Sequence, residues 1–134
     1  MITAKVKYIG QLRTEATHVR SNNHIITDAP VDNNGKGEAF SPTDLVATSL
    51  ASCMLTIMGI KAETNAINFN NASVDVIKQM AADPRRISAI SLSFVLSKSL
   101  SEKERKLLEH AAKTCPVAHS IHPDIKTDVV FNYQ

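Results

Sequence analysis

The sequence contains no tryptophan, few aromatic residues of any kind and only a small excess of positive charge. Aromatic side chains make up 4% of the 134 residues and the formal net charge is +2, which leaves little for tracking phosphates or for stacking bases. No apolar run approaches the roughly 18 residues of a membrane span, and the first residues show no basic segment followed by an apolar one. We therefore expect no nucleic-acid partner, no membrane span and a cytoplasmic location.

The sequence is also poor in cysteine, with only Cys53 and Cys115, which lie 62 positions apart. This spacing fits neither a zinc ribbon nor a thioredoxin-like C-x-x-C motif, and a reducing cytosol would keep a purely structural disulfide open. A zinc site would need His119 and His122 as a tight ligand pair beside Cys53, and their spacing does not match that of such pairs. We therefore predict neither a metal nor another cofactor.

The length and the N-terminal pattern favour one domain that begins with a small sheet. With 43% hydrophobic and 21% charged residues, the chain is expected to form a single domain over residues 1–134. Apolar and polar residues alternate over 2–8, and further strands are expected around 13–19 and 24–27, which together predict an N-terminal meander. Residues 28–40 contain a proline, two glycines and two asparagines without periodicity, and predict a loop.

A long helix is predicted to begin at Ser41. The Ser41 side chain can cap free amides, Pro42 suits the first helical position, and Asp44 follows the cap by three residues. The helix is expected to run to about Thr64, and residues 45–60 carry no charged side chain on any face, so it should be buried all round. Because a small monomer could hardly cover every side of such a helix, we predict a dimer.

The rest of the chain predicts a second sheet with a covering helix. Strands are expected over 74–80, 90–96 and 125–133. A capping box at Ser101 predicts a helix that ends near Thr114 and covers a sheet. The combination of strands and helices predicts an α+β class.

Each cysteine has a structural interpretation when it is considered alone. Cys53 could be a small buried hydrophobic residue, since free cysteines are often buried. Pro116 disfavours helical geometry at Cys115, which should end the preceding helix there. If residues 115–119 open a short new helix, free amides would lower the pKa of the Cys115 thiol; otherwise Cys115 is a packed residue at a corner.

Two segments together resemble a known family. The first is "SPTDLVATSLASC" at 41–53. It begins with the five-residue motif (Asn or Ser)-Pro-any-(Asp, Glu or Gln)-Leu, and a Cys follows later in the same helix. The second segment is "CPVAHSI" at 115–121. Their order and spacing resemble those of the OsmC/Ohr family of osmotically inducible and organic-hydroperoxide-resistance proteins. The resemblance implies an intertwined α+β homodimer, with antiparallel sheets wrapped around central helices and the site at the subunit interface.

The resemblance also implies an antioxidant activity, that of a thiol-dependent peroxidase acting on organic hydroperoxides. Cys53 would attack the peroxide and become a sulfenic acid, and Cys115 would condense with it into an intramolecular disulfide if the two Cα atoms lie within about 7 Å. A dithiol or thiol reductant would then restore both thiols. Family peroxidases use an arginine beside the attacking sulfur; position along the chain favours Arg13, with Arg20 as the alternative.

One departure from the family keeps other functions open. Many family peroxidases carry a glutamate directly after the motif proline, where this chain has Thr43; Asp44 and Glu38 are the other acidic candidates. The alternative function is therefore an OsmC-like redox-sensing or small-molecule-binding protein without efficient peroxidase turnover. A cysteine hydrolase that uses Cys115 with His119 as base is a further interpretation, and it would need an oxyanion hole.

Overall fold

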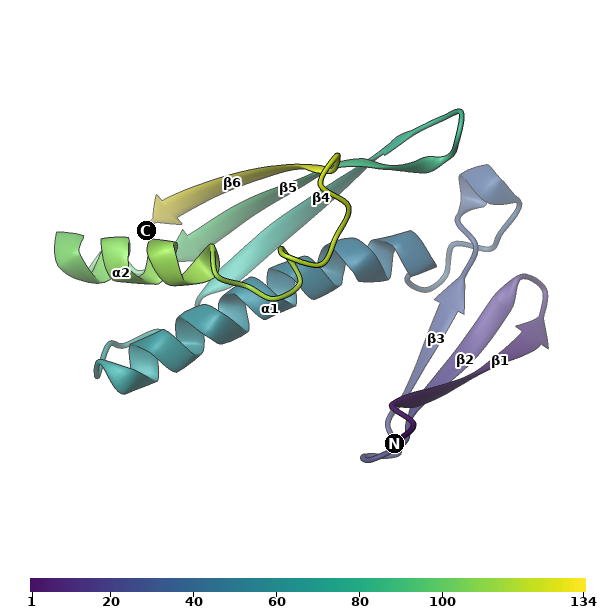
Figure 1. Cartoon of the computed structure of the whole chain (residues 1–134), viewed down its shortest axis with the longest axis horizontal. Coiled ribbons are helices and arrows are strands. Elements are labelled where there is room, and N and C mark those ends of the chain that lie inside the picture. The colour runs from purple at the N-terminus through teal and green to yellow at the C-terminus, as the bar shows by residue number, and fades with distance from the viewer. The chain divides into compact units, whose positions relative to one another are not determined.

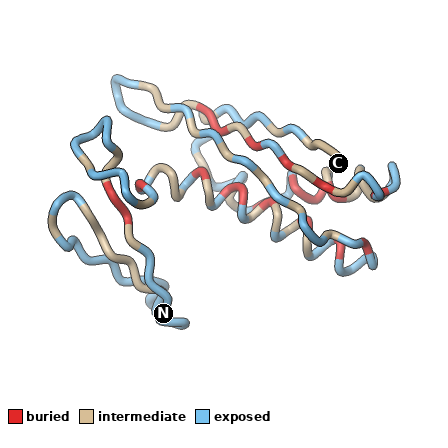
Figure 2. Tube along the Cα trace, turned by 180° about the vertical axis from the view of Figure 1, so that it is seen from behind, coloured by how far each residue is buried: buried red, intermediate tan, exposed pale blue.

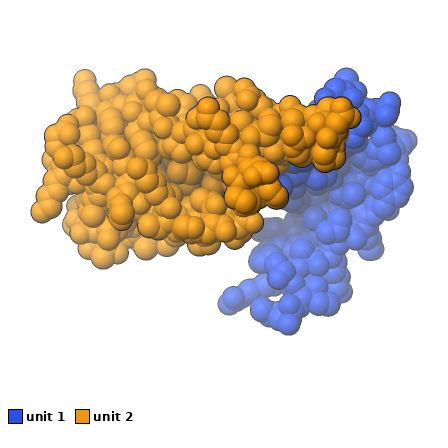
Figure 3. All heavy atoms as spheres, turned by 45° about the horizontal axis from the view of Figure 1, so that its top comes forward, with its two compact units in different colours: residues 1–46 blue, residues 47–134 orange.

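The structure is a computed structural model, and it describes all residues, 1–134. The elements in chain order are β1 (Ala4–Gly10), β2 (Arg13–His18), β3 (His24–Asp28), the 3-10 helix η1 (Val31–Asn33), α1 (Pro42–Thr64), β4 (Ser73–Ala81), β5 (Arg86–Leu96), α2 (Glu102–Ala112) and β6 (Lys126–Tyr133) (Figure 1). The chain divides into two compact units, Met1–Val46 and Ala47–Gln134 (Figure 3).

The first unit contains the predicted meander, an antiparallel sheet of order β1-β2-β3. The hairpin between β1 and β2 turns at Gln11 and Leu12, whose φ angles are 54° and 60°. Positive φ at both central residues is typical of the two-residue turns that match strand twist. The expected strand positions are confirmed, although this turn lacks the Asn-Gly or Asp-Gly pair that usually marks it.

One face of this sheet carries exposed apolar side chains. Val6 lies opposite Ala16, which in turn lies opposite Ile25, and both Val6 and Ile25 are exposed. Strand β1, near the N-terminus, is exposed along most of its length (Figure 2). Tyr8 on the same face is exposed as well. A contiguous apolar surface of this kind commonly marks a protein interaction site.

The second unit contains a mixed sheet of order β4-β5-β6. β4 and β5 are antiparallel, as expected, whereas β5 and β6 run parallel. The prediction of wholly antiparallel sheets is therefore wrong for this pair. The physical reason is the connection: α2 lies between β5 and β6 in sequence and carries the chain back to the starting end of the sheet, which makes the next strand parallel.

Both helices cover one face of the second sheet (Figure 1). β5 contributes the predicted core face, and the Phe94 and Phe131 rings from β5 and β6 stack with their centroids 5.1 Å apart. The largest fully buried apolar side chains are Leu50, Met58, Ile90, Leu92, Phe94 and Leu108. The serine-rich opposite face of β5 confirms the predicted alternation.

Helix α1 has the predicted start and end. The Ser41 hydroxyl accepts a hydrogen bond from the Asp44 amide at 3.0 Å, and the Asp44 carboxylate accepts one from the Ser41 amide at 3.0 Å. Its buried residues recur at three- and four-residue intervals: Ala47, Leu50, Ala51, Met54, Met58 and Ala62. The other side is open within one chain, since Ser52, Thr56 and Ile60 are exposed. Burial of α1 on every side, which was expected only in a dimer, stays a prediction, because the one sheet and one helix of the single chain cover only one side.

The apolar character of α1 also corrects the statement about membrane spans. An 18-residue window of this helix has a mean hydropathy of 1.6, so its length and composition would suffice to cross a membrane. A core helix passes the same test, and α1 contributes the buried stripe that packs into the core of the second unit. The structure therefore accounts for its apolarity by packing.

Candidate active site

Cys53 lies on α1, about three turns after the cap at Ser41. It is half-buried, with the buried Met54 on one side in sequence and the exposed Ser52 on the other. Its side chain packs against the core of the second unit. The attacking sulfur of the predicted site is thus held by a regular helix at the border between the core and the open side.

Cys115 lies just beyond the end of α2 and is fully buried. α2 ends at Ala112 with Lys113 as its cap. The residues after Pro116 form turns in which the His119 amide donates to the Cys115 carbonyl at 3.3 Å. The break before the proline is confirmed, and the second option, a packed corner residue, describes Cys115 better than a new helix does.

The structure brings the two sulfurs together. The Cys53 side chain packs against the buried cluster that contains Cys115, and the two thiols are close enough to affect each other electrostatically. Residues separated by 62 positions thus meet at the inner side of α1. The joint reaction of the two thiols, which the resemblance implies, stays a prediction.

The electrostatics of Cys115 differ from the prediction. Burial raises the pKa of the Cys115 thiol, and the hydrogen bond to Cys53 raises this pKa further. The amides of Ala118 and Val117 lower it, as expected for free amides after a helix break, but their effect is smaller than that of burial. Residues 115–119 do not open a new helix, so the condition on which a lowered pKa was expected is not met, and desolvation disfavours the thiolate. Burial thus favours the neutral thiol form of Cys115.

Arg13 belongs to the first unit and forms an ion pair with Asp28. Its Nε lies 2.7 Å from Oδ1 and its Nη2 lies 2.9 Å from Oδ2 of Asp28. The carboxylate also accepts a hydrogen bond from the Glu38 amide at 3.0 Å. Hydrogen bonding by Arg13 is the main cause that holds the pKa of Asp28 below its usual value, so Asp28 is ionised at neutral pH.

The sequence interpretation does not name Asp28 as the partner of Arg13. It places residue 28 in the loop and offers Glu38 and Asp44 as the acidic candidates. In the structure Glu38 contributes its backbone amide, and Asp44 caps α1. A signal was available: an antiparallel pairing of the two predicted strands places Arg13 opposite Asp28, and the observed register does so.

The remaining polar candidates have few neighbouring groups that could take part in catalysis or metal binding. No group of three or more His, Cys, Asp or Glu side chains is arranged to hold a metal ion. His119 is exposed, and the contact it makes with Cys115 joins backbone atoms. A hydrolase needs an activated thiolate, whereas burial raises the pKa of Cys115. The hydrolase interpretation gains no support.

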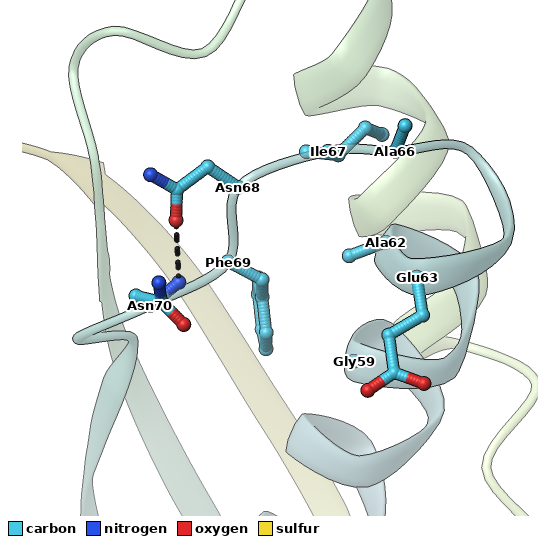
Figure 4. A pocket seen from close by; sticks show the side chains of 8 residues that line it. All are labelled: Gly59, Ala62, Glu63, Ala66, Ile67, Asn68, Phe69 and Asn70. Atoms are coloured by element: carbon cyan, nitrogen blue, oxygen red, sulfur yellow. Dashed lines mark hydrogen bonds between the residues drawn. The ribbon is translucent and has the colours of Figure 1, made fainter.

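A shallow hollow lies at the C-terminal end of α1, with a volume of about 450 Å³ (Figure 4). Its lining residues are Gly59, Ala62, Glu63, Ala66, Ile67, Asn68, Phe69 and Asn70. Asn68 accepts a hydrogen bond from the Asn70 amide at 3.0 Å, which shapes the loop around it. Neither cysteine lines this hollow, so it is a feature separate from the thiol pair.

Comparison with known proteins identifies relatives of the whole chain. The structure of a candidate osmotic-stress-induced and detoxification response protein from Psychrobacter arcticus 273-4 is 57% identical in sequence, covers 98% of this chain and 96% of that chain, and has a TM-score of 0.95. The organic hydroperoxide resistance protein OsmC of Legionella pneumophila is 18% identical, covers 98% of each chain and has a TM-score of 0.76. A candidate organic hydroperoxide resistance protein from Vibrio cholerae O1, with captopril bound in one of its active sites, is 16% identical, covers 98% of this chain and 92% of that chain, and has a TM-score of 0.75.

These comparisons agree with the architecture of two helices and two sheets. The latter two structures, at low identity, show the same fold, and comparison with curated protein sequences finds no match. The family model described as OsmC-like protein matches residues 35–130, a span that contains both cysteine motifs. The protein therefore belongs to the OsmC-like family, the group that also includes the organic hydroperoxide resistance proteins.

Proposed function

We propose that the protein is a cytoplasmic thiol peroxidase that reduces organic hydroperoxides as part of an oxidative stress response. The observation that carries this proposal is that Cys53 packs against the core cluster that contains the buried Cys115, so that the two thiols are neighbours in the second unit. A second thiol beside Cys53 can react with the sulfenic acid that oxidation of Cys53 would form. The names of the Legionella and Vibrio relatives, which refer to organic hydroperoxide resistance, support the same substrate class.

In the first step the Cys53 thiolate attacks the terminal oxygen of the hydroperoxide. A sulfur–oxygen bond forms, the oxygen–oxygen bond breaks, and the alkoxide leaves and takes a proton to become the alcohol. Sulfur is oxidised to a sulfenic acid and the peroxide is reduced by two electrons. In the second step Cys115 condenses with the sulfenic acid to form a disulfide and releases water.

The disulfide requires an external reductant for turnover. A dithiol or two thiols attack it by exchange and return both cysteines to the thiol state. The Cys115 sulfur is fully buried, so a reductant would reach the half-buried Cys53 first. We propose that attack at the Cys53 sulfur begins this reset, with Cys115 as the leaving group.

We propose that Arg13 supplies the positive charge for the peroxide step. A guanidinium favours the thiolate form of a neighbouring cysteine and stabilises charge that develops on the departing oxygen. The Arg13 side chain is 29% exposed, so part of it remains open to a ligand. Arg20 is the alternative donor, and comparison of Arg13→Ala with Arg20→Ala decides between them.

The surroundings of Cys53 favour a substrate with an apolar tail. Ile57, one turn after it on α1, is half-buried and offers apolar surface, whereas Leu50, one turn before it, is fully buried within the chain. Burial of apolar substrate surface contributes about 25 cal/mol per Å². An organic hydroperoxide can gain this free energy and hydrogen peroxide cannot.

We also propose that the protein works as an intertwined homodimer. The open side of α1, with its exposed Ile60, and the apolar face of the first sheet around Val6 and Ile25 are surfaces that a second copy can cover. Sedimentation equilibrium is expected to give twice the monomer mass of 14.6 kDa. A monomer at micromolar concentration contradicts this part of the proposal.

The experiment that tests the function counts thiols after one equivalent of cumene hydroperoxide. Wild type is expected to lose both thiols, and Cys115→Ser is expected to lose one and to yield a sulfenic acid at Cys53 that a cyclic 1,3-dione traps. With a dithiol reductant present, wild type turns over repeatedly. If both thiols survive, the peroxidase proposal is wrong; if both are lost without turnover, the alternative of a redox sensor, suggested by Thr43, replaces it.

A further inference from the structure

Tyr133 at the end of β6 joins this last strand to two turns of α2. Its hydroxyl donates a hydrogen bond to the Glu109 carboxylate, and the Arg105 guanidinium carbon lies 4.1 Å from the centroid of the Tyr133 ring. Arg105 and Glu109 are four residues apart on α2, so they lie on the same face of the helix. The end of β6 and α2 belong to the second unit and lie side by side (Figure 1). One side chain thus holds α2 at two successive turns.

Arg105 extends this contact to the segment between β5 and α2. Its Nε donates to the Leu100 carbonyl at 3.0 Å, and its Nη2 donates to the Lys98 carbonyl at 2.9 Å. Two backbone carbonyls therefore fix the guanidinium, while its face lies on the tyrosine ring, an arrangement that cation–π attraction favours. We call Arg105, Glu109 and Tyr133 the tyrosine cluster.

The Tyr133 hydroxyl is a donor at neutral pH. Burial raises the pKa of this phenol, and the hydrogen bond to Glu109 raises it further. An ordinary tyrosine already has a pKa of about 10. Because the acceptor is a carboxylate, this hydrogen bond is stronger than one between two neutral groups.

Apolar packing alone defines the position of α2 on the sheet less well. The buried side chains of α2 are Leu108, Ala111 and Ala112, so its last turn presents two methyl groups to the core. Complementary shapes of large side chains give a core one well-ordered arrangement, and a surface of small side chains offers little of this complementarity. The tyrosine cluster supplies directional contacts that this surface lacks.

The far end of α2 leads directly to Cys115. The helix ends at Ala112, and the Thr114 amide donates to the Ala111 carbonyl at 3.0 Å, so the turns continue up to the residue before the cysteine. Cys115 is fully buried, and Cys53 packs against the core cluster that contains it. A shift or rotation of α2 would therefore move the Cys115 sulfur relative to Cys53.

We propose that Tyr133 is a positioning residue for disulfide formation, which holds α2 so that Cys115 reaches the oxidised Cys53. This inference rests on the proposed function and adds the residue that controls its second step. In that step a bond forms between the two sulfurs, the sulfur–oxygen bond of the sulfenic acid breaks, and the hydroxide leaves with the thiol proton as water. The Cys53 sulfur is reduced and the Cys115 sulfur is oxidised. Because the sulfurs of a disulfide lie only about 2.05 Å apart, a small displacement of α2 should slow this step.

The test follows both steps after one equivalent of cumene hydroperoxide, with a cyclic 1,3-dione present to compete for the sulfenic acid. Tyr133→Phe keeps the ring but loses the hydroxyl. It is expected to oxidise Cys53 at the wild-type rate and to form the disulfide about 10-fold more slowly, so that intact mass shows more dione adduct and less disulfide. Glu109→Ala should behave in the same way, whereas Glu109→Gln keeps an acceptor for the hydroxyl and should restore most of the disulfide.

Two control variants separate positioning from a general loss of stability. Ser101→Ala removes the cap of α2 but leaves the tyrosine cluster intact, so it should keep the wild-type ratio of disulfide to dione adduct. Tyr8→Phe changes an exposed tyrosine of the first unit and should keep this ratio as well. Once Tyr133→Phe is present, Glu109→Ala should have no further effect, because both changes remove the same contact.

A second measurement does not depend on the peroxide. At equilibrium with reduced and oxidised glutathione, two exchange steps convert the protein dithiol to the disulfide and oxidised glutathione to two thiols. The equilibrium constant reports the effective concentration of one protein thiol at the other. Tyr133→Phe should lower this effective concentration about 10-fold, and Ser101→Ala should leave it unchanged.

The outcomes that overturn the inference are distinct from failure of the function. If the wild type forms the disulfide and Tyr133→Phe forms it equally fast, the function stands and the role of Tyr133 is wrong. An equal slowing by Ser101→Ala, or a Glu109→Gln as slow as Glu109→Ala, overturns this role too, and the two Glu109 variants keep the test decisive if Tyr133→Phe does not fold. If cumene hydroperoxide oxidises no thiol of the wild type, the proposed function is wrong, and the inference about its second step falls with it.

Discussion

The assignment of roles to the two sulfurs can be tested by leaving Cys115 alone in the chain. Burial is the main cause of its raised pKa, and burial is unchanged in Cys53→Ser. A cysteine of ordinary pKa, about 8.5, is about 3% thiolate at pH 7. Because the pKa of Cys115 is higher than that of an ordinary thiol, its thiolate fraction lies below this value.

The magnitude follows from this fraction, since the thiolate is the nucleophile. At pH 7 the Cys115 sulfur in Cys53→Ser should react with a hydroperoxide at least about 30-fold more slowly than a fully ionised sulfur of the same nucleophilicity. Its complete burial slows the reaction further. The rate should rise about tenfold per pH unit and show no plateau below about pH 8.5, because the pKa of the group is raised.

The assay is single-turnover oxidation with cumene hydroperoxide under anaerobic conditions, quenched with an alkylating reagent and counted by intact mass. Cys115→Ser is the companion variant and should keep a fast first step, because Cys53 remains. Oxidation of Cys53→Ser within about threefold of the wild-type rate at pH 7, or a plateau well below pH 8.5, would refute the reasoning. A slow Cys115→Ser with a fast Cys53→Ser would reverse the two roles.

Three further predictions concern stability. Gly59→Ala should raise the free energy of unfolding in urea by about 0.5–1 kcal/mol, because glycine is costly inside a helix. The added Cβ would meet the Phe69 ring at 3.8 Å, an ordinary contact distance. Destabilisation would mean that another chain packs closely against this position. Ser101→Ala should cost about 1 kcal/mol, because it removes the capping box with Glu104; an unchanged urea midpoint argues against a role for this cap. The pKa of Asp28 is lowered in the folded state, so the ionised carboxylate stabilises the fold above the usual aspartate pKa of about 3.9, and this stability is lost as the pH falls through the folded pKa. In Asp28→Asn the free energy of unfolding should therefore depend less on pH in the acid range. An acid unfolding curve identical to that of the wild type contradicts this prediction.

Local chemistry made several elements predictable from the sequence. The bounds of α1 follow from the cap formed by Ser41 and Asp44 and from a long stretch without a helix breaker, and both signals act within a few residues. The alternation on β5 and the capping box of α2 are equally local. The break at Pro116 follows from a steric clash with the preceding residue.

Long-range packing decided the features that the sequence interpretation missed. The parallel pairing of β5 with β6 depends on the path of the connection through α2, which periodicity does not encode. The exposed side of α1 depends on how many elements are present to cover it. The pairing of Arg13 with Asp28 was accessible through the strand register, but the end of β3 extends one residue beyond the predicted strand.

The site shows the same division between local and distant causes. Both cysteines and the arginine were identified by residue type, motif and resemblance, and the sequence determined which atoms are available for chemistry. Only the tertiary structure placed the Cys115 thiol against Cys53 and set the direction of its pKa shift. The amides after the helix break are local and lower that pKa, whereas burial by distant residues raises it and prevails, because desolvation depends on everything that surrounds a group in space.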